Sequence, residues 1–141
     1  MAQVRHLALD PKKQMARVLI VDDSRATRAG LRVAFLNEGF DVATARDGVE
    51  ALAYLNAGYA VDVIVLDLMM SGMDGWTFRR AQRRDPWLAD IPVVVMSGLE
   101  PRAMRGATPV AAFQKPVNVN ELVSTVRAIC RRRRRFVSER K

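Results

Sequence analysis

Residues 63–75 read VIVLDLMMSGMDG, and this stretch decides the fold of the chain. The four apolar residues 63–66 predict a short β-strand buried on both faces, as strands of parallel sheets are. The run ends at Asp67, and the two glycines that follow predict a loop. In open α/β sheets, ligands bind outside the carboxyl ends of the strands. Asp67 is therefore a candidate functional residue, although a single aspartate could equally cap the next turn.

Three further apolar runs end in polar residues. In chain order the four strand ends are Asp22-Asp23, Asp67, Ser97 and Lys115-Pro116. If the first and third strands are parallel neighbours, three carboxylates meet at one edge of the sheet. They cannot all remain charged there without a counter-ion. Few protein oxygens, with water filling the other positions, favour Mg²⁺ as that ion.

Strand and helix patterns alternate along the chain with short connections, which predicts βαβ units and a parallel sheet with helices on both faces. The expected strands are 17–21, 41–45, 62–66, 92–96 and 111–114. Capping residues place helix starts near Ser24, Asp47, Asp74 and Asn118. After Pro101 there is room for only about two helical turns before Pro109.

The order of the strand ends resembles the receiver domain of two-component response regulators, over about residues 15 to 130. The matching residues are Asp22-Asp23, Asp67 with Met70 and Met73-Asp74-Gly75, Ser97, and Lys115-Pro116. The resemblance is to the stand-alone, chemotaxis-regulator-like type. It implies a flavodoxin-like, doubly wound sheet of five parallel strands in the order 2-1-3-4-5, with helices on both faces and a short fourth helix.

The resemblance also implies a chemistry. Asp67 would accept a phosphoryl group from a phosphohistidine of a histidine kinase or phosphotransfer protein. Mg²⁺ would be held by Asp22, Asp23, Asp67 and the backbone carbonyl of Met69. Ser97 would act as a switch, Lys115 would bind the phosphoryl group, and the Lys115–Pro116 peptide bond would be cis. The chain would be a signalling protein that catalyses only its own phosphorylation and dephosphorylation, and it would switch a surface that binds an unknown downstream protein.

Three features depart from the family pattern. Ala112 stands where the family usually has an aromatic residue that moves with the switch hydroxyl, and Phe113 is interpreted as a core strand residue. The span from Ser97 to Lys115 is short for the family. Ser71 stands where a proline is common, which predicts a looser loop after Asp67.

Charge is distributed unevenly along the 141 residues, whose formal net charge is +8. Residues 15–130 contain equal numbers of basic and acidic side chains, so the excess lies at the ends. We therefore divide the chain into a flexible leader (1–14), a receiver domain (15–130) and a basic tail (131–141). A single cysteine excludes an internal disulfide, and no run reaches transmembrane length. A cytoplasmic protein without membrane contact is expected.

Two other functions remain open at this stage. The run Arg131–Arg135 could bind nucleic acid through the phosphate backbone, with the rest of the chain as a scaffold. A Mg²⁺-dependent phosphatase with an aspartate nucleophile is the second. Such enzymes usually carry a second acid two residues after the nucleophile, and this position is Met69.

Overall fold

The computed structural model describes residues 15–139, and for 134–139 it describes the backbone alone. One sheet of five parallel strands has the order β2-β1-β3-β4-β5, which confirms the predicted topology. The strands are β1 (Arg17–Val21), β2 (Asp41–Ala45), β3 (Val63–Asp67), β4 (Val93–Ser97) and β5 (Ala111–Gln114). The helices are α2 (Arg25–Asn37), α3 (Gly48–Asn56), α4 (Gly75–Arg84) and α5 (Val119–Glu139), with the 3₁₀ helix η2 (Pro101–Ala107).

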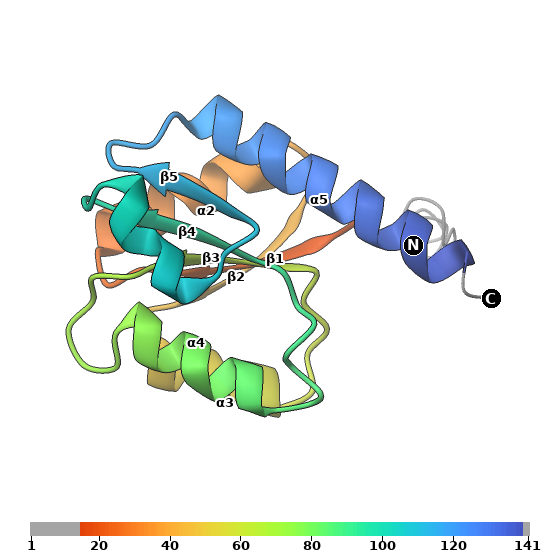
Figure 1. Cartoon of the computed structure of the whole chain (residues 1–141). Coiled ribbons are helices and arrows are strands. Elements are labelled where there is room, and N and C mark those ends of the chain that lie inside the picture. The colour runs from red at the N-terminus through yellow and green to blue at the C-terminus, as the bar shows by residue number, and fades with distance from the viewer. Residues whose placement is uncertain (1–14, 140–141) are drawn as a thin grey trace.

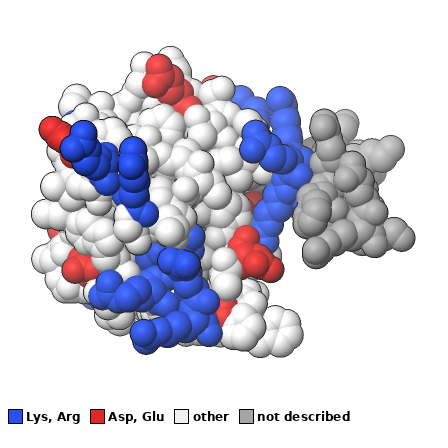
Figure 2. Space-filling view, in the orientation of Figure 1, with Lys and Arg blue, Asp and Glu red and all other residues white. Residues whose placement is uncertain are grey.

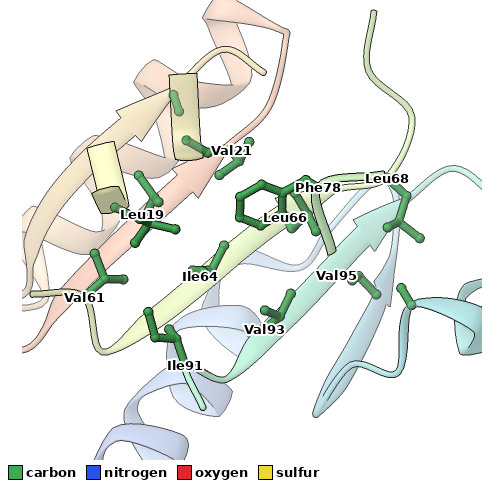
Figure 3. Close-up of a cluster of buried hydrophobic side chains, with 14 of the residues drawn as sticks. Leu19, Val21, Val61, Ile64, Leu66, Leu68, Phe78, Ile91, Val93 and Val95 are labelled. Atoms are coloured by element: carbon green, nitrogen blue, oxygen red, sulfur yellow. The ribbon is translucent and has the colours of Figure 1, made fainter. Parts of the chain in front are cut away.

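The helices cover both faces of the sheet: α2 and α5 lie on one side, and α3 and α4 lie on the other (Figure 1). Each face has its own apolar core, one containing Leu66 and Phe78 and the other containing Phe35 and Leu122. In Figure 3 the Phe78 ring lies over the central strands beside Leu66. All residues of β3 and β4 are buried, as expected for central strands of a parallel sheet.

Local capping determines where the helices begin and end. The side chain of Asp47 accepts a hydrogen bond from the backbone N–H of Glu50 at 2.9 Å, and Asp74 accepts one from Thr77 at 2.8 Å. Gly39 follows α2 with a φ of +88°, a conformation that glycine adopts without a steric penalty. These contacts confirm the predicted helix ends. The ends could be predicted because each capping contact joins residues that are close in sequence.

Several details differ from the sequence prediction. The third and fourth strands each begin one residue later, at Val63 and Val93, and include Asp67 and Ser97 as their last residues. The short helix after Pro101 is 3₁₀ rather than α. The helix α5 continues to Glu139, so the boundary expected at residue 130 falls inside a helix and residues 131–139 extend it. The expected leader, 1–14, lies outside the described residues.

One arginine of the basic run joins α5 to the sheet. The guanidinium of Arg133 donates hydrogen bonds to the backbone carbonyls of Val61 and Asp62, at 3.4 and 2.9 Å. Arginine is also a strong helix former, which favours continuation of the helix through the run. Over the part of the chain that the structure describes, no helix combines the length and the apolar character needed to cross a membrane.

The close approach of α4 to β3 requires a glycine at position 75. A Cβ there would lie 2.6 Å from Leu68 Cα and 2.7 Å from the carbonyl oxygen of Asp67, both backbone atoms. We expect Gly75→Ala to lower the free energy of unfolding by about 2 kcal/mol, because the backbone around Asp67 must shift. Gly30→Ala is the matched control: no atom lies within 4 Å of its added Cβ, so a gain of up to about 1 kcal/mol is expected. Urea unfolding measures both, and equal effects would contradict the prediction.

Candidate functional site

The sheet register brings the predicted acids together. Strands β1 and β3 are neighbours with Val21 opposite Leu66, so the next residues, Asp22 and Asp67, emerge side by side at the carboxyl edge. One carboxylate oxygen from each of Asp22, Asp23 and Asp67 lies within 4.8 Å of the others. Three oxygen donors at such spacing have the chemistry that a hard divalent cation requires. The residues present therefore fit a Mg²⁺ ion.

Lys115 reaches this cluster from the end of β5. Its Nζ lies 2.9 Å from Oδ2 of Asp22 and 3.3 Å from Oδ2 of Asp67. Asp22 is fully buried and Asp67 is 3% exposed, so both carboxylates depend on the ammonium and on backbone donors. The N–H of Ser24 donates to Asp22 Oδ1 at 2.8 Å, and the N–H of Met69 donates to Asp67 Oδ1 at 3.0 Å.

Burial raises the pKa of Asp67 above its ordinary value, and the negative charge of Asp22 acts in the same direction. The Met69 N–H and Lys115 oppose this rise without cancelling it. Burial would lower the pKa of Lys115, but its hydrogen bond to Asp22 and the charges of both aspartates outweigh burial and raise it. The site therefore holds a firmly charged ammonium beside a carboxylate that is costly to ionise.

Asp23 is the exposed member of the cluster, and Ser71 orients it. Both the N–H and the hydroxyl of Ser71 donate to Asp23 Oδ2, at 3.1 and 3.4 Å. A proline at position 71 could not donate the N–H. In this structure Ser71 thus ties the loop after Asp67 to β1. Sequence reasoning missed this contact, because it depends on how the loop folds back over the site.

The predicted switch residue is buried at the end of β4. The hydroxyl of Ser97 accepts a hydrogen bond from the N–H of Leu99 at 3.1 Å, which directs it to its own loop. Phe113 is half-buried against the core, and Ala112 is exposed. Position 112 thus offers a methyl group to solvent, where the family pattern has a moving aromatic ring. The Lys115–Pro116 bond is cis.

A further contact supports the loop that carries the acid pair. The guanidinium of Arg28, one turn into α2, donates to the backbone carbonyl of Asp22 at 2.7 Å. Together with Ser24 this fixes the backbone turn that presents Asp22 and Asp23. The sequence could not identify Arg28 as the residue that makes this contact, because three arginines lie on the same helix.

Comparison with known proteins identifies the class to which this fold and site belong. The family model of the response regulator receiver domain matches residues 18–127, so the chain belongs to that family. The chain is 38% identical over 122 residues to the response regulator PleD of Caulobacter vibrioides, covering 82% of this chain and 26% of PleD. It is 37% identical to the response regulator MprA of Mycobacterium sp., covering 82% and 51%.

Solved structures agree with this assignment. The chemotaxis response regulator CheY4 of Vibrio cholerae superposes with a TM-score of 0.76 at 30% identity, covering 82% of this chain and 99% of CheY4. The receiver domain of the Francisella response regulator 1452 gives a TM-score of 0.75 at 29% identity, covering 83% and 98%. The chain spans about a quarter to a half of the length of the curated relatives it matches.

We predict that Asp67→Asn stabilises the metal-free chain at neutral pH. The pKa of Asp67 is raised in the folded chain, so its favourable contribution is complete below the unfolded pKa of about 4 and is lost as the pH rises through the folded value. At pH 7 with a chelator, the free energy of unfolding of the variant should exceed that of the wild type by about 1 kcal/mol.

The gain should shrink as the pH falls towards 4, where wild-type Asp67 is protonated. Asp90→Asn, at an exposed aspartate, serves as the control and should change stability little at either pH. Denaturant unfolding at several pH values measures the difference. A destabilised Asp67→Asn variant at pH 7 would show that the ionised carboxylate is favourable in the folded chain.

Proposed function

We propose that this chain is a phosphoacceptor and that Asp67 is the residue that is phosphorylated. The observation that supports this most directly is the placement of a buried Asp67 beside Asp22, Asp23 and Lys115 at the carboxyl edge of the sheet. Phosphoryl transfer needs an in-line nucleophile and positive charge around the equatorial oxygens, with little other chemistry from the protein. Asp67 would be that nucleophile, and Lys115 together with a divalent cation held by the acids would supply that charge.

The donor would be a phosphohistidine of a histidine kinase or phosphotransfer protein. The P–N bond to the donor imidazole breaks as a P–O bond forms to a carboxylate oxygen of Asp67, and the imidazole leaves after taking up a proton. The product is an acyl phosphate on Asp67. Hydrolysis of that acyl phosphate by water restores the aspartate, so the chain would catalyse only these two reactions on itself.

Asp22, Asp23, Asp67 and the backbone carbonyl of Met69 would hold Mg²⁺, which when bound supplies charge neutralisation for the phosphoryl oxygens. The residues of the chain have distinct tasks around it. Ser71 orients Asp23, and the Met69 N–H orients Asp67. Lys115, now paired with both buried aspartates, would turn its ammonium towards the new phosphoryl group.

Ser97 would transmit the event to the surface. Its hydroxyl oxygen accepts from the N–H of Leu99 in this structure, which leaves the hydroxyl proton free for a phosphoryl oxygen, and the hydroxyl would have to move towards Asp67 to donate it. The segment after β4 must then change its position. A charge added at Asp67 would thereby alter the shape presented to a downstream protein.

The donor protein must approach the edge of the sheet where Asp67 lies. A cavity of about 370 Å³ opens there beside Lys115, between α2 and residues 116–119, and it is lined mainly by apolar residues such as Ala26, Leu31 and Val119. Such a surface suits contact with the apolar face of a partner helix. A cytoplasmic location is consistent with this role and forms part of the proposal.

The structure gives little support to the two alternatives. In the basic run, the guanidinium of Arg133 donates to backbone carbonyls of the folded domain, and of the other arginines whose side chains are described, Arg131 and Arg132 are exposed within α5. For a phosphatase, Met69 offers no general acid at the position where one is needed. Neither nucleic-acid binding nor turnover of phosphate esters is therefore proposed.

Incubation with acetyl phosphate and Mg²⁺ tests the proposed function directly. Intact-mass measurement should show one added phosphoryl group on the wild type and none on Asp67→Asn. Omission of Mg²⁺, or Asp23→Asn, should reduce labelling by about tenfold or more, because charge on the phosphoryl oxygens is no longer neutralised. Asp90→Asn, far from the site in sequence and fold, should label normally. Labelling that persists in Asp67→Asn would place the acceptor elsewhere.

A further inference from the structure

Helix α4 carries two polar side chains, Gln82 and Arg79, that form a hydrogen-bond network where the helix packs on the core. Gln82 is fully buried, and its side-chain amide N–H groups donate to the backbone carbonyls of Leu88 and Ile91, at 2.9 and 3.0 Å. Its Oε1 accepts a hydrogen bond from the guanidinium of Arg79 at 2.7 Å. Every polar atom of the Gln82 side chain is thus satisfied, so Gln82 provides a rigid support for Arg79.

Arg79 extends from this support to the end of η2. Its Nε donates to the carbonyl of Ala107 at 2.9 Å, and a terminal nitrogen donates to the carbonyl of Thr108 at 3.0 Å. Carbonyls at the end of a helical turn carry partial negative charge and attract cations. Burial, together with the charge of Arg83, lowers the pKa of Arg79, so the position is electrostatically costly. The carbonyl contacts offset that cost.

The segment that Arg79 holds is the one that follows the proposed switch. It leaves β4 at Ser97, whose hydroxyl accepts from Leu99, and it returns to β5 after Thr108, which has a φ of +45°. Between these points Met104 and Ala107 are buried in the core that α4 also contacts. Residues 98–110 are therefore fixed at one end by Ser97 and at the other by Arg79.

We propose that Arg79 is a positioning residue that holds the segment 98–110 in its resting place and thereby opposes phosphorylation of Asp67. This inference rests on the proposed function, in which the hydroxyl of Ser97 moves towards the phosphoryl group and the segment that follows it must also move. Position 112 lacks an aromatic side chain that could move with Ser97, so the chain needs another contact to couple the segment to the site. The two hydrogen bonds from Arg79 to the carbonyls of Ala107 and Thr108 provide one.

The neighbouring arginines supply a matched control. Figure 2 shows that Lys and Arg side chains gather over the region of α4, so several arginines share its electrostatic surroundings. Arg80 is exposed and bonds only to the hydroxyl of Thr77 within its own helix, at 3.2 Å. Removal of Arg80 therefore changes the local charge by the same amount as removal of Arg79, while the contacts to Ala107 and Thr108 remain.

Hydrogen exchange measures the restraint without reference to phosphorylation. In Arg79→Ala, the amides of residues 99–110 should exchange at least about tenfold faster than in the wild type, since a hydrogen bond to a charged group contributes about that factor. The amides of β1 and β3 should be unchanged, and Arg80→Ala should match the wild type throughout. Arg79→Lys keeps the charge but not the planar geometry, so it should behave like Arg79→Ala.

Unchanged exchange in residues 99–110 would overturn the proposal. So would an equal acceleration in β3 in both Arg79 variants, because Arg79 would then contribute only to global stability.

Labelling with limiting acetyl phosphate and Mg²⁺ tests the coupling. The phosphorylated fraction should be several-fold higher in Arg79→Ala than in Arg80→Ala, because the freed segment no longer favours the resting state. An equal fraction in the two variants would overturn the coupling. A wild type that is not labelled at all would instead contradict the proposed function, while the exchange experiment would still report whether Arg79 holds the segment.

Discussion

The structure depends on the balance of charge at one edge of the sheet. Two carboxylates, Asp22 and Asp67, are almost completely removed from water and lie side by side because their strands are parallel neighbours. Two such charges repel each other strongly at low dielectric, and the ammonium of Lys115 is what makes the arrangement tolerable. The ends of three strands, β1, β3 and β5, must therefore meet at one point. The loops around that edge are built to hold them there.

The same balance of charge explains why the site lowers the stability of the folded chain. The raised pKa of Asp67 shows that its ionised form is disfavoured in the folded chain, and the glycine at position 75 is required so that α4 can approach the Asp67 backbone closely. Neither feature strengthens the core. Both keep the carboxylate of Asp67 in a defined place, and buried β3 and β4 supply the rigidity that this needs.

Much of the fold and the cluster of acids could be predicted from the sequence, because they follow from short-range rules. Buried parallel strands are continuous apolar runs, and their ends share one edge, so Asp22, Asp67 and Lys115 could be brought together without coordinates. Helix starts such as Asp74 depend on neighbours three residues away. Contacts of long side chains could not be predicted: the carbonyls that Arg79 and Arg133 bind are 28 or more residues away, and they become acceptors only after the chain has folded.

Several arginines contribute to the net charge and also hold parts of the fold together. A charge of +8 and a run of five arginines favour a nucleic-acid partner when they are counted along the sequence. In the fold, Arg28, Arg79 and Arg133 each donate to backbone carbonyls at the ends of loops or helices, where the fork of the guanidinium can bind several acceptors at once. Each one fixes a connection: the loop of the acid pair, the segment after Ser97, or the start of β3. A short connection such as 98–110 has little core of its own, so a single side chain at its end can determine where it rests. If that restraint is released when Asp67 is modified, the short connection itself becomes the part of the surface that changes.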